Sequence, residues 1–166
     1  TPIFARHIKR KIRGNNLICV SPDVGGVERT RALGRRINSG IAIIDKRRPA
    51  PGKSEVMNIV GSVKGKICFI VDDIIDSGGT IVNAAKVLKE KGAKDVYVYA
   101  THAVLSGDAI EKLKKSSIKK LIITDSIDNS HKIKKIPKIE VLSIASMMAE
   151  AIKRISNSTS VSSLFK

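Results

Sequence analysis

The chain has 166 residues, of which 42% are hydrophobic and 28% are charged, a composition typical of a folded globular domain. Lysine and arginine number 31 against 15 acidic residues, which gives a net charge of +16 at pH 7. No apolar stretch approaches the ~20 residues of a membrane-spanning helix and no signal-peptide pattern opens the chain, so we expect a cytoplasmic protein. Cys19 and Cys68 lie inside apolar runs and are expected to be buried, reduced thiols.

The basic residues gather in four segments, 6–13, 45–49, 112–115 and 132–138. Such segments can bind nucleic acid, a membrane surface or an anionic substrate. Aromatic residues are only 3% of the chain, so base stacking on a single strand is poorly supported, and we interpret the lysine-rich segments as solvated surface. The segment 45–49 (DKRRP) differs because it is rich in arginine, follows a predicted strand and ends in proline.

Helix and strand patterns alternate along the chain. In chain order we predict a helix over 2–13, strands over 16–23, 41–45, 55–61, 66–73, 95–101, 119–125 and 139–144, and further helices over 25–37, 79–92, 107–115 and 145–156. Strands that read as continuous Val/Ile runs between helices predict an α/β fold, with a mostly parallel sheet and helices on both faces. Met147, Met148 and Ile152 of the last helix are expected in the core, and the serine-rich tail after Ser156 is expected to be loosely ordered.

Polar residues follow four of the predicted strands, at 21–23, 45–48, 72–73 and 101–102. In open parallel sheets, ligands bind outside the carboxyl ends of the strands. Each of these strand ends is a weak signal alone, but their accumulation at one edge of the sheet predicts a binding site there.

The segment 71–80, VDDIIDSGGT, joins a predicted strand to a predicted helix. Gly78 and Gly79 allow close approach of the backbone to a ligand, and the N–H groups at a helix start attract anions. The hydroxyls of Ser77 and Thr80 either donate to phosphate oxygens or cap the helix. The carboxylates at 72, 73 and 76 would repel phosphate, so they suit sugar hydroxyls or Mg²⁺. The pattern therefore predicts a site for a phosphorylated sugar.

VDDIIDSGGT resembles the phosphoribosyl-diphosphate loop that type I phosphoribosyltransferases share with phosphoribosyl diphosphate (PRPP) synthetases. The loop alone does not choose between them. The segments SPDVGGVERTR (21–31), DKRRP (45–49), YATHAVLSG (99–107) and ISNSTSVSSLF (155–165) resemble the class I ribose-phosphate diphosphokinases, the PRPP synthetases of nucleotide biosynthesis. The resemblance runs over essentially the whole chain and implies a type I phosphoribosyltransferase-like fold.

The resemblance implies an enzyme that transfers the β,γ-diphosphoryl group of MgATP to the anomeric hydroxyl of ribose 5-phosphate and releases AMP. It implies that Asp76, Ser77, Gly78, Gly79 and Thr80 hold the 5-phosphate, that Asp72 and Asp73 engage the ribose hydroxyls, that Asp23 binds Mg²⁺, and that Lys46 and Arg48 belong to a mobile catalytic loop after the second strand. Cations that close over the transferred phosphate suit phosphoryl transfer, which depends on positioning and charge stabilisation. The Gly25–Gly26 turn is either a further phosphate contact or only a tight turn.

Members of this family are about twice as long as this chain, which matches only their C-terminal half. The resemblance implies that the other half supplies much of the adenine pocket and a metal-binding histidine, a context in which none of the histidines of this chain lies. We expect residues 1–156 to form the C-terminal domain and 157–166 its tail. The expected partners are ATP, ribose 5-phosphate and either a separate N-terminal half or further copies of the chain, as in the family's hexamers, with no nucleic acid or membrane.

Two alternative functions remain on the same fold. A free-standing phosphoribosyltransferase should carry a base-binding hood segment, and none is visible beyond the sheet pattern. A non-catalytic, basic, RNA-binding regulator would fit the charge of +16, but it would have little reason to keep both DKRRP and VDDIIDSGGT.

Overall fold

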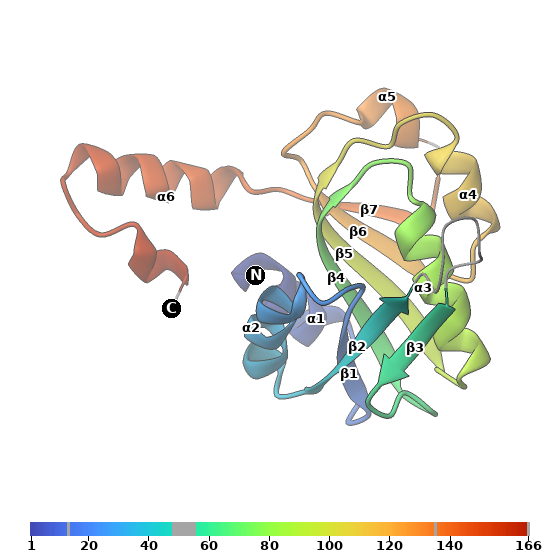
Figure 1. Ribbon diagram of the computed structural model, residues 1–166. Coiled ribbons are helices and arrows are strands. Elements are labelled where there is room, and N and C mark those ends of the chain that lie inside the picture. Colours follow the sequence, from blue (N-terminus) through green and yellow to red (C-terminus); the bar gives the residue numbers. More distant parts are fainter. Residues whose placement is uncertain (13, 48–55, 135, 166) are drawn as a thin grey trace.

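The computed structural model describes residues 1–12, 14–47, 56–134 and 136–165, and Figure 1 shows how its helices and strands are arranged. Helix and strand alternate along most of the chain, as the sequence predicted. In chain order the elements are α1 (Pro2–Lys11), β1 (Leu17–Ser21), α2 (Val27–Ile37), β2 (Gly40–Arg47), β3 (Val56–Val60), β4 (Ile67–Ile75), α3 (Gly79–Glu90), β5 (Asp95–Ala103), α4 (Ala109–Lys115), β6 (Lys120–Thr124), α5 (Ser130–Ile133), β7 (Ile139–Leu142), α6 (Ala145–Ser156) and the 3₁₀ helix η1 (Ser162–Phe165).

Within the described residues, seven strands form one sheet in the order β3-β2-β1-β4-β5-β6-β7. All neighbours are parallel except β2 and β3, which form an antiparallel hairpin at one edge. From β1 the chain passes through α2 to β2 on one side, whereas from β4 it passes through α3 to β5 on the other side. The winding therefore reverses between β1 and β4, and this switch point is where open α/β sheets bind ligands.

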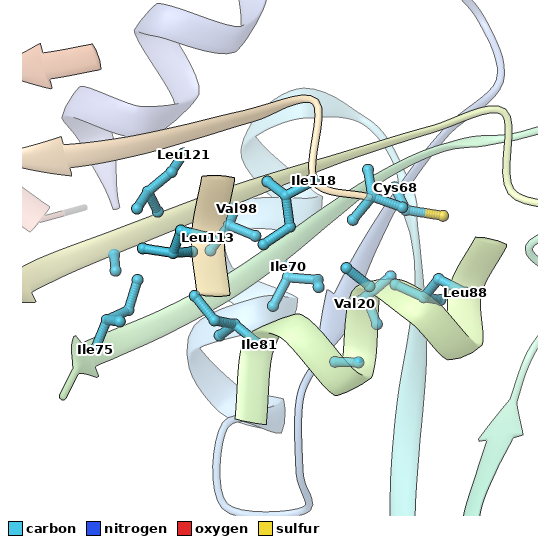
Figure 2. Packing of buried hydrophobic residues seen from close by; sticks show 14 of the residues in the cluster. Val20, Cys68, Ile70, Ile75, Ile81, Leu88, Val98, Leu113, Ile118 and Leu121 are labelled. Atoms are coloured by element: carbon cyan, nitrogen blue, oxygen red, sulfur yellow. The ribbon is translucent and has the colours of Figure 1, made fainter. Parts of the chain in front are cut away.

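Alternate side chains of β4 point to opposite faces of the sheet, as strand geometry requires. Cys68 and Ile70 pack into the core on the side of α3 and α4, which Figure 2 shows from close by. Phe69 and Val71 pack into a second core on the side of α1 and α2. All four are buried, which explains why the strand reads as one continuous apolar run and confirms the predicted sheet with helices on both faces.

Helix α1 is amphipathic, as predicted, and its apolar face covers the sheet. Phe4 and Ile8, one turn apart, are both buried. The ring of Phe4 meets the ring of Tyr99 edge to face, with 5.3 Å between the centroids. Such aromatic pairs add to the stabilisation that comes from burial, so α1 is held firmly on β5.

Cys19 and Cys68 are free, fully buried thiols, as the sequence predicted. Burial raises the pKa of Cys19 to about 11 and that of Cys68 to about 12, so both stay protonated and unreactive. Separately, no helix in the described parts of the chain has both the length and the apolar character needed to cross a bilayer.

The strand β2 extends further than its sequence pattern indicated. Residues 45–47 continue the strand because they pair with residues 56–58 of β3 in antiparallel register. The interpretation of DKRRP as a loop after the second strand is therefore wrong for Lys46, whose backbone lies in β2. Arg48 lies outside the described residues.

The expectation that Met148 and Ile152 belong to the core is wrong. Helix α6 extends away from the sheet (Figure 1), and these side chains are 48% and 63% exposed. The following tail folds back on α6, because Arg154 Nη1 donates to the carbonyl of Ser160 at 2.9 Å and η1 follows. An amphipathic pattern predicts that a helix has an apolar face, but it does not say what covers that face.

Candidate functional site

A cavity of about 400 Å³ opens at the carboxyl ends of β1 and β4, on the two sides of the switch point. Three segments form it: the β1–α2 turn, the first turn of α2, and the end of β4 with the start of α3. Its lining residues are Asp23, Gly25, Arg29, Asp72, Asp73, Ile74, Ile75, Asp76, Ser77, Gly78, Gly79, Thr80 and Ile81. The predicted sugar-phosphate residues and Asp23 are thus brought together, although they are about fifty positions apart in sequence.

A hydrogen bond and a sharp turn shape the connection from β4 to α3. The carbonyl of Asp76 accepts a hydrogen bond from the N–H of Ser106 at 3.1 Å, which ties the connection to the segment after β5. Gly78, the N-cap residue of α3, has φ of +73°, a left-handed conformation that glycine adopts without steric cost. The sharp turn at Gly78 therefore aims the start of α3 into the cavity.

The N-terminus of α3 is open toward the cavity. The first N–H groups of a helix have no partner within the helix, and no side chain of the described residues caps α3. The hydroxyls of Ser77 and Thr80 therefore do not act as caps, which leaves them available to a ligand. Unpartnered N–H groups together with the helix dipole attract an oxyanion such as phosphate.

Arg29 connects the two acidic residues at the end of β4 to helix α2. Its Nη1 donates to Oδ1 of Asp72 at 2.8 Å, and its Nη2 donates to Oδ2 of Asp73 at 2.7 Å. The guanidinium thus offsets the charge of two adjacent carboxylates and fixes their orientation. Sequence reasoning missed Arg29, because nothing in the local pattern distinguishes it from Arg31 or Arg35 of the same helix.

The carboxyl group of Asp72 is set apart from its neighbours by burial. Burial, together with a smaller effect of the adjacent Asp73 carboxylate, raises the pKa of Asp72 to about 6. The hydrogen bond from the N–H of Asp73 and the Arg29 guanidinium oppose this rise. Its side chain is 14% exposed, whereas that of Asp73 is 56% exposed. Asp72 therefore faces the interior of the cavity and Asp73 faces its rim.

Asp23 shapes the turn after β1. Its Oδ1 accepts a hydrogen bond from the N–H of Gly26 at 2.8 Å, and its carbonyl accepts one from the hydroxyl of Ser21 at 2.6 Å. A Cβ on Gly26 would lie 2.8 Å from that hydroxyl oxygen, so the close turn requires glycine there. Gly26 therefore serves the turn, while Gly25 lines the cavity.

Of the other two predicted strand ends, the one after β5 does not line this cavity in the part of the chain that the structure describes. His102, near the end of β5, pairs its Nδ1 with the hydroxyl of Ser126 at 3.0 Å. The backbone of Lys46 lies in β2, but its side chain and Arg48 are outside what the structure describes, so the strand end at 45–48 stays a prediction. The expectation that all four strand ends share one site is therefore supported for β1 and β4 and not for β5.

Among the described residues, no group of three or more His, Cys, Asp or Glu side chains is arranged to hold a metal ion. Mg²⁺ usually keeps several waters and binds through one or two carboxylates together with substrate phosphates. Asp23 is exposed and adjacent to the open end of α3, so the residues present fit a Mg²⁺ ion that is held largely by water and phosphate.

The sequence is similar to known proteins along nearly its whole length. The family model of the phosphoribosyl synthetase-associated domain matches residues 43–166. The chain is 54% identical over 164 residues to a ribose-phosphate pyrophosphokinase of Bradyrhizobium diazoefficiens, which covers 99% of this chain and 52% of that protein. It is 53% identical over 165 residues to the enzyme of that name from Fusobacterium nucleatum, with 99% and 52% covered. The chain thus spans about half the length of the curated relatives it matches.

Solved structures of proteins with related names are also similar to this chain. A phosphoribosylpyrophosphate synthetase from Mycobacterium smegmatis superposes with a TM-score of 0.84 at 34% identity, over 94% of this chain and 50% of that one. An adenine phosphoribosyltransferase superposes with a TM-score of 0.61 at 18% identity over 74% and 75% of the two chains, which shows a shared fold alone. The predicted phosphoribosyltransferase-like fold and the resemblance to PRPP synthetases are therefore confirmed, and the chain belongs to the phosphoribosyl synthetase-associated domain family.

Proposed function

We propose that the chain is the sugar-phosphate-binding half of a ribose-phosphate diphosphokinase. That enzyme transfers the diphosphoryl group of MgATP to the C1 hydroxyl of ribose 5-phosphate, which yields PRPP for nucleotide biosynthesis and AMP. The observation that carries the proposal is the 400 Å³ cavity in which an uncapped helix N-terminus meets a pair of carboxylates at the switch point of the sheet. The names of relatives that share about half of its residues agree with it.

The two ends of ribose 5-phosphate match the two chemistries of the cavity. Residues 76–80 at the start of α3 offer N–H groups and hydroxyls to the 5-phosphate. Asp72 and Asp73 offer carboxylate oxygens to the ribose hydroxyls, and Arg29 holds both carboxylates in position. The sugar would then lie between the carboxylates of Asp72 and Asp73 and the phosphate-binding residues 76–80, with its C1 hydroxyl toward the open side of the cavity.

The transfer itself depends on charge. The C1 oxygen attacks the β-phosphorus, and the bond between the α- and β-phosphates breaks, so negative charge must be stabilised on the phosphate oxygens. Lys46 and Arg48, at and beyond the end of β2, are the proposed cations that act there. Asp23 is the proposed Mg²⁺ ligand, and the ion, when bound, neutralises phosphate charge.

The proposed enzyme needs more than this chain. Residues 1–156 are the proposed C-terminal domain and 157–166 its tail, and the part that binds adenine would come from the other half of the enzyme. We infer assembly with that half or with further copies of the chain, because the relatives are about twice as long. A cytoplasmic setting is a separate proposal. The alternatives, a free-standing phosphoribosyltransferase and a basic RNA-binding protein, have no observation in their favour beyond fold and charge.

The deciding experiment measures AMP release from ATP and ribose 5-phosphate. The chain is assayed alone and with a supplied N-terminal half from a relative, and we expect release that depends on ribose 5-phosphate in the second case. If both assays are inactive while PRPP and a free base are converted to a nucleotide, the phosphoribosyltransferase reading replaces the proposal. Oligonucleotide affinity with a steep dependence on salt, without sugar-phosphate binding, would instead favour the RNA-binding reading.

A further inference from the structure

A second cavity, of about 270 Å³, lies between helix α1 and the carboxyl end of β7. Among the residues that the structure describes, it shares no lining residue with the cavity at the switch point. Three cationic side chains of α1, Arg6, Arg10 and Lys11, line it together with His7. None of the motifs assigned above includes these residues, so the proposed function leaves this cavity unexplained.

The described part of the chain does not balance the charge of this cavity. Within the described residues, Arg6, Arg10 and Lys11 form no ion pair or hydrogen bond through their side chains. Glu140 is the acidic residue of the lining, and both of its oxygens are engaged: Oε1 accepts from Nε2 of His7 at 3.0 Å, and Oε2 accepts from Nζ of Lys120 at 3.3 Å. The cavity therefore presents unpaired positive charge.

The helix that carries these cations is firmly positioned. Phe4 and Ile8 anchor α1 on the sheet, and His7 sits between the Tyr99 hydroxyl, 3.0 Å from its Nδ1, and Glu140. The His7 side chain is only 10% exposed. A ligand would therefore meet a preformed wall, which lowers the entropic cost of binding.

The arrangement of the cations suits one chemical group. Arg6 and Arg10 are four residues apart, so they lie one above the other on one face of α1. Two guanidinium groups with fork geometry match the oxygens of a phosphate group. Ile3 and Leu142, both half-buried, complete the lining and offer an apolar surface beside the cations.

We propose that this cavity binds a small phosphate monoester, with its phosphate between Arg6 and Arg10 and its apolar body against Ile3 and Leu142. Lys11 adds long-range attraction, and the His7–Glu140 pair forms the back of the site. The inference does not depend on the proposed function, because it uses no residue of the sugar-phosphate cavity.

The test titrates the 166-residue chain with phenyl phosphate and, in parallel, with inorganic phosphate, and follows each amide and the His7 ring by NMR. Site-resolved signals separate this cavity from the cradle at 76–80, which can bind phosphate as well. We expect saturable shifts over α1 and at His7, with phenyl phosphate bound more tightly than inorganic phosphate.

Variants then assign the charge. The double variant Arg6→Gln/Arg10→Gln should weaken phenyl phosphate binding at α1 at least about ten-fold, because it removes two charge-assisted contacts. Lys9→Gln is the matched control: Lys9 is exposed on the same helix but does not line the cavity, so binding should stay within about two-fold. Because all three side chains are exposed, the fold should be kept, and dispersed amide spectra verify this.

Three results would overturn the proposal. The first is the absence of saturable shifts at α1 and His7 in the parent chain, a result that needs no variant. The second is equal loss of phenyl phosphate binding in the double variant and in Lys9→Gln, which would indicate a diffuse basic surface. A single-stranded oligonucleotide that binds more tightly than phenyl phosphate, and that loses affinity equally in both variants, would indicate the same. The third is equal affinity for the two phosphates, which would remove the apolar part of the site.

Discussion

Arg29 in the first turn of α2 donates a hydrogen bond to Asp72 at the end of β4, at 2.8 Å and across 43 positions of the sequence. The contact links α2, which follows β1, to β4, so it spans the switch point of the sheet. Asp73 shares the same guanidinium, and two neighbouring carboxylates that would otherwise repel each other are held together. The geometry of the proposed sugar site thus depends on a cation outside the loop that carries the motif.

Replacement of Arg29 by alanine should weaken ribose 5-phosphate binding. A hydrogen bond to a charged group contributes about 1.5–3 kcal/mol, so we expect a loss of about ten-fold or more in calorimetric titration. Arg31→Ala is the matched control, because Arg31 is exposed on the same helix and does not line the cavity. Unchanged affinity in Arg29→Ala would show that the carboxylates do not need this partner.

Replacement of Gly78 by valine should abolish ribose 5-phosphate binding. Its φ of +73° excludes a β-branched residue without strain, so the turn that aims α3 into the cavity must change. Gly65→Val is the control, because Gly65 has φ of +71° and open space around it but precedes β4 and does not line the cavity. Both variants should lose about 1–2 kcal/mol of stability in thermal unfolding, and only Gly78→Val should lose the ligand. Ribose without its phosphate should bind the parent far more weakly than ribose 5-phosphate, and equal affinity would contradict the cradle.

The raised pKa of Asp72 predicts a pH dependence of stability. Its value of about 6 exceeds the ordinary 3.8, so between these values the folded chain binds more protons than the unfolded chain. The free energy of unfolding therefore falls as pH rises through this window. The variant Asp72→Asn lacks this titration. From pH ~4 to pH ~7 its free energy of unfolding should therefore rise by about 1 kcal/mol relative to that of the parent, after allowance for solvent screening.

Asp108→Asn provides the control of opposite sign for this titration. The hydrogen bond from Lys112 lowers the pKa of Asp108, so that variant should lose stability relative to the parent as pH rises. Chemical denaturation at several pH values measures both. For each variant, the difference in free energy of unfolding from the parent is followed against pH. If this difference changes with pH in the same direction for both variants, the burial of Asp72 does not govern its titration.

Lys46 should act on turnover and not on sugar binding. In an enzyme reconstituted with its N-terminal half, Lys46→Ala should lower turnover by about two to three orders of magnitude, as in comparable deletions of charge-stabilising donors. Ribose 5-phosphate affinity should stay within a few-fold. Arg47→Ala is the control, because Arg47 is the neighbouring cation of the same segment and the proposal gives it no role in the transfer. Equally mild effects of both, or an effect of Lys46→Ala through sugar affinity alone, would make DKRRP an ordinary solvated segment.

The exposed face of α6 should support self-association. Met148, Ile152 and Ile155 are 48%, 63% and 67% exposed and follow one another at helical spacing. We expect the chain to sediment as more than a monomer at micromolar concentration, and Ile152→Ser to weaken association about ten-fold. Lys153→Ser, at the next position, should not. A clean monomer, unchanged when 157–166 are removed, would contradict this.

Local patterns along the sequence were enough to predict most of the fold and the phosphate cradle. The continuous apolar run of β4 requires burial on both faces, and burial on both faces requires helices on both sides of a parallel sheet. The phosphate site at residues 77–80 could be predicted from neighbouring residues alone, because glycine conformation and the N–H groups at a helix N-terminus are local properties.

The tertiary structure decided what depends on distant partners. Arg29 could be distinguished from the other arginines only once folding had placed it beside Asp72. The end of β2 was extended by pairing with β3, and the apolar face of α6, indistinguishable in sequence from a buried one, was left exposed. The cavity between α1 and β7 joins residues more than 130 positions apart. Periodicity and propensity act over a few residues, whereas ion pairs, strand pairing and burial are settled by which surfaces the whole chain brings into contact.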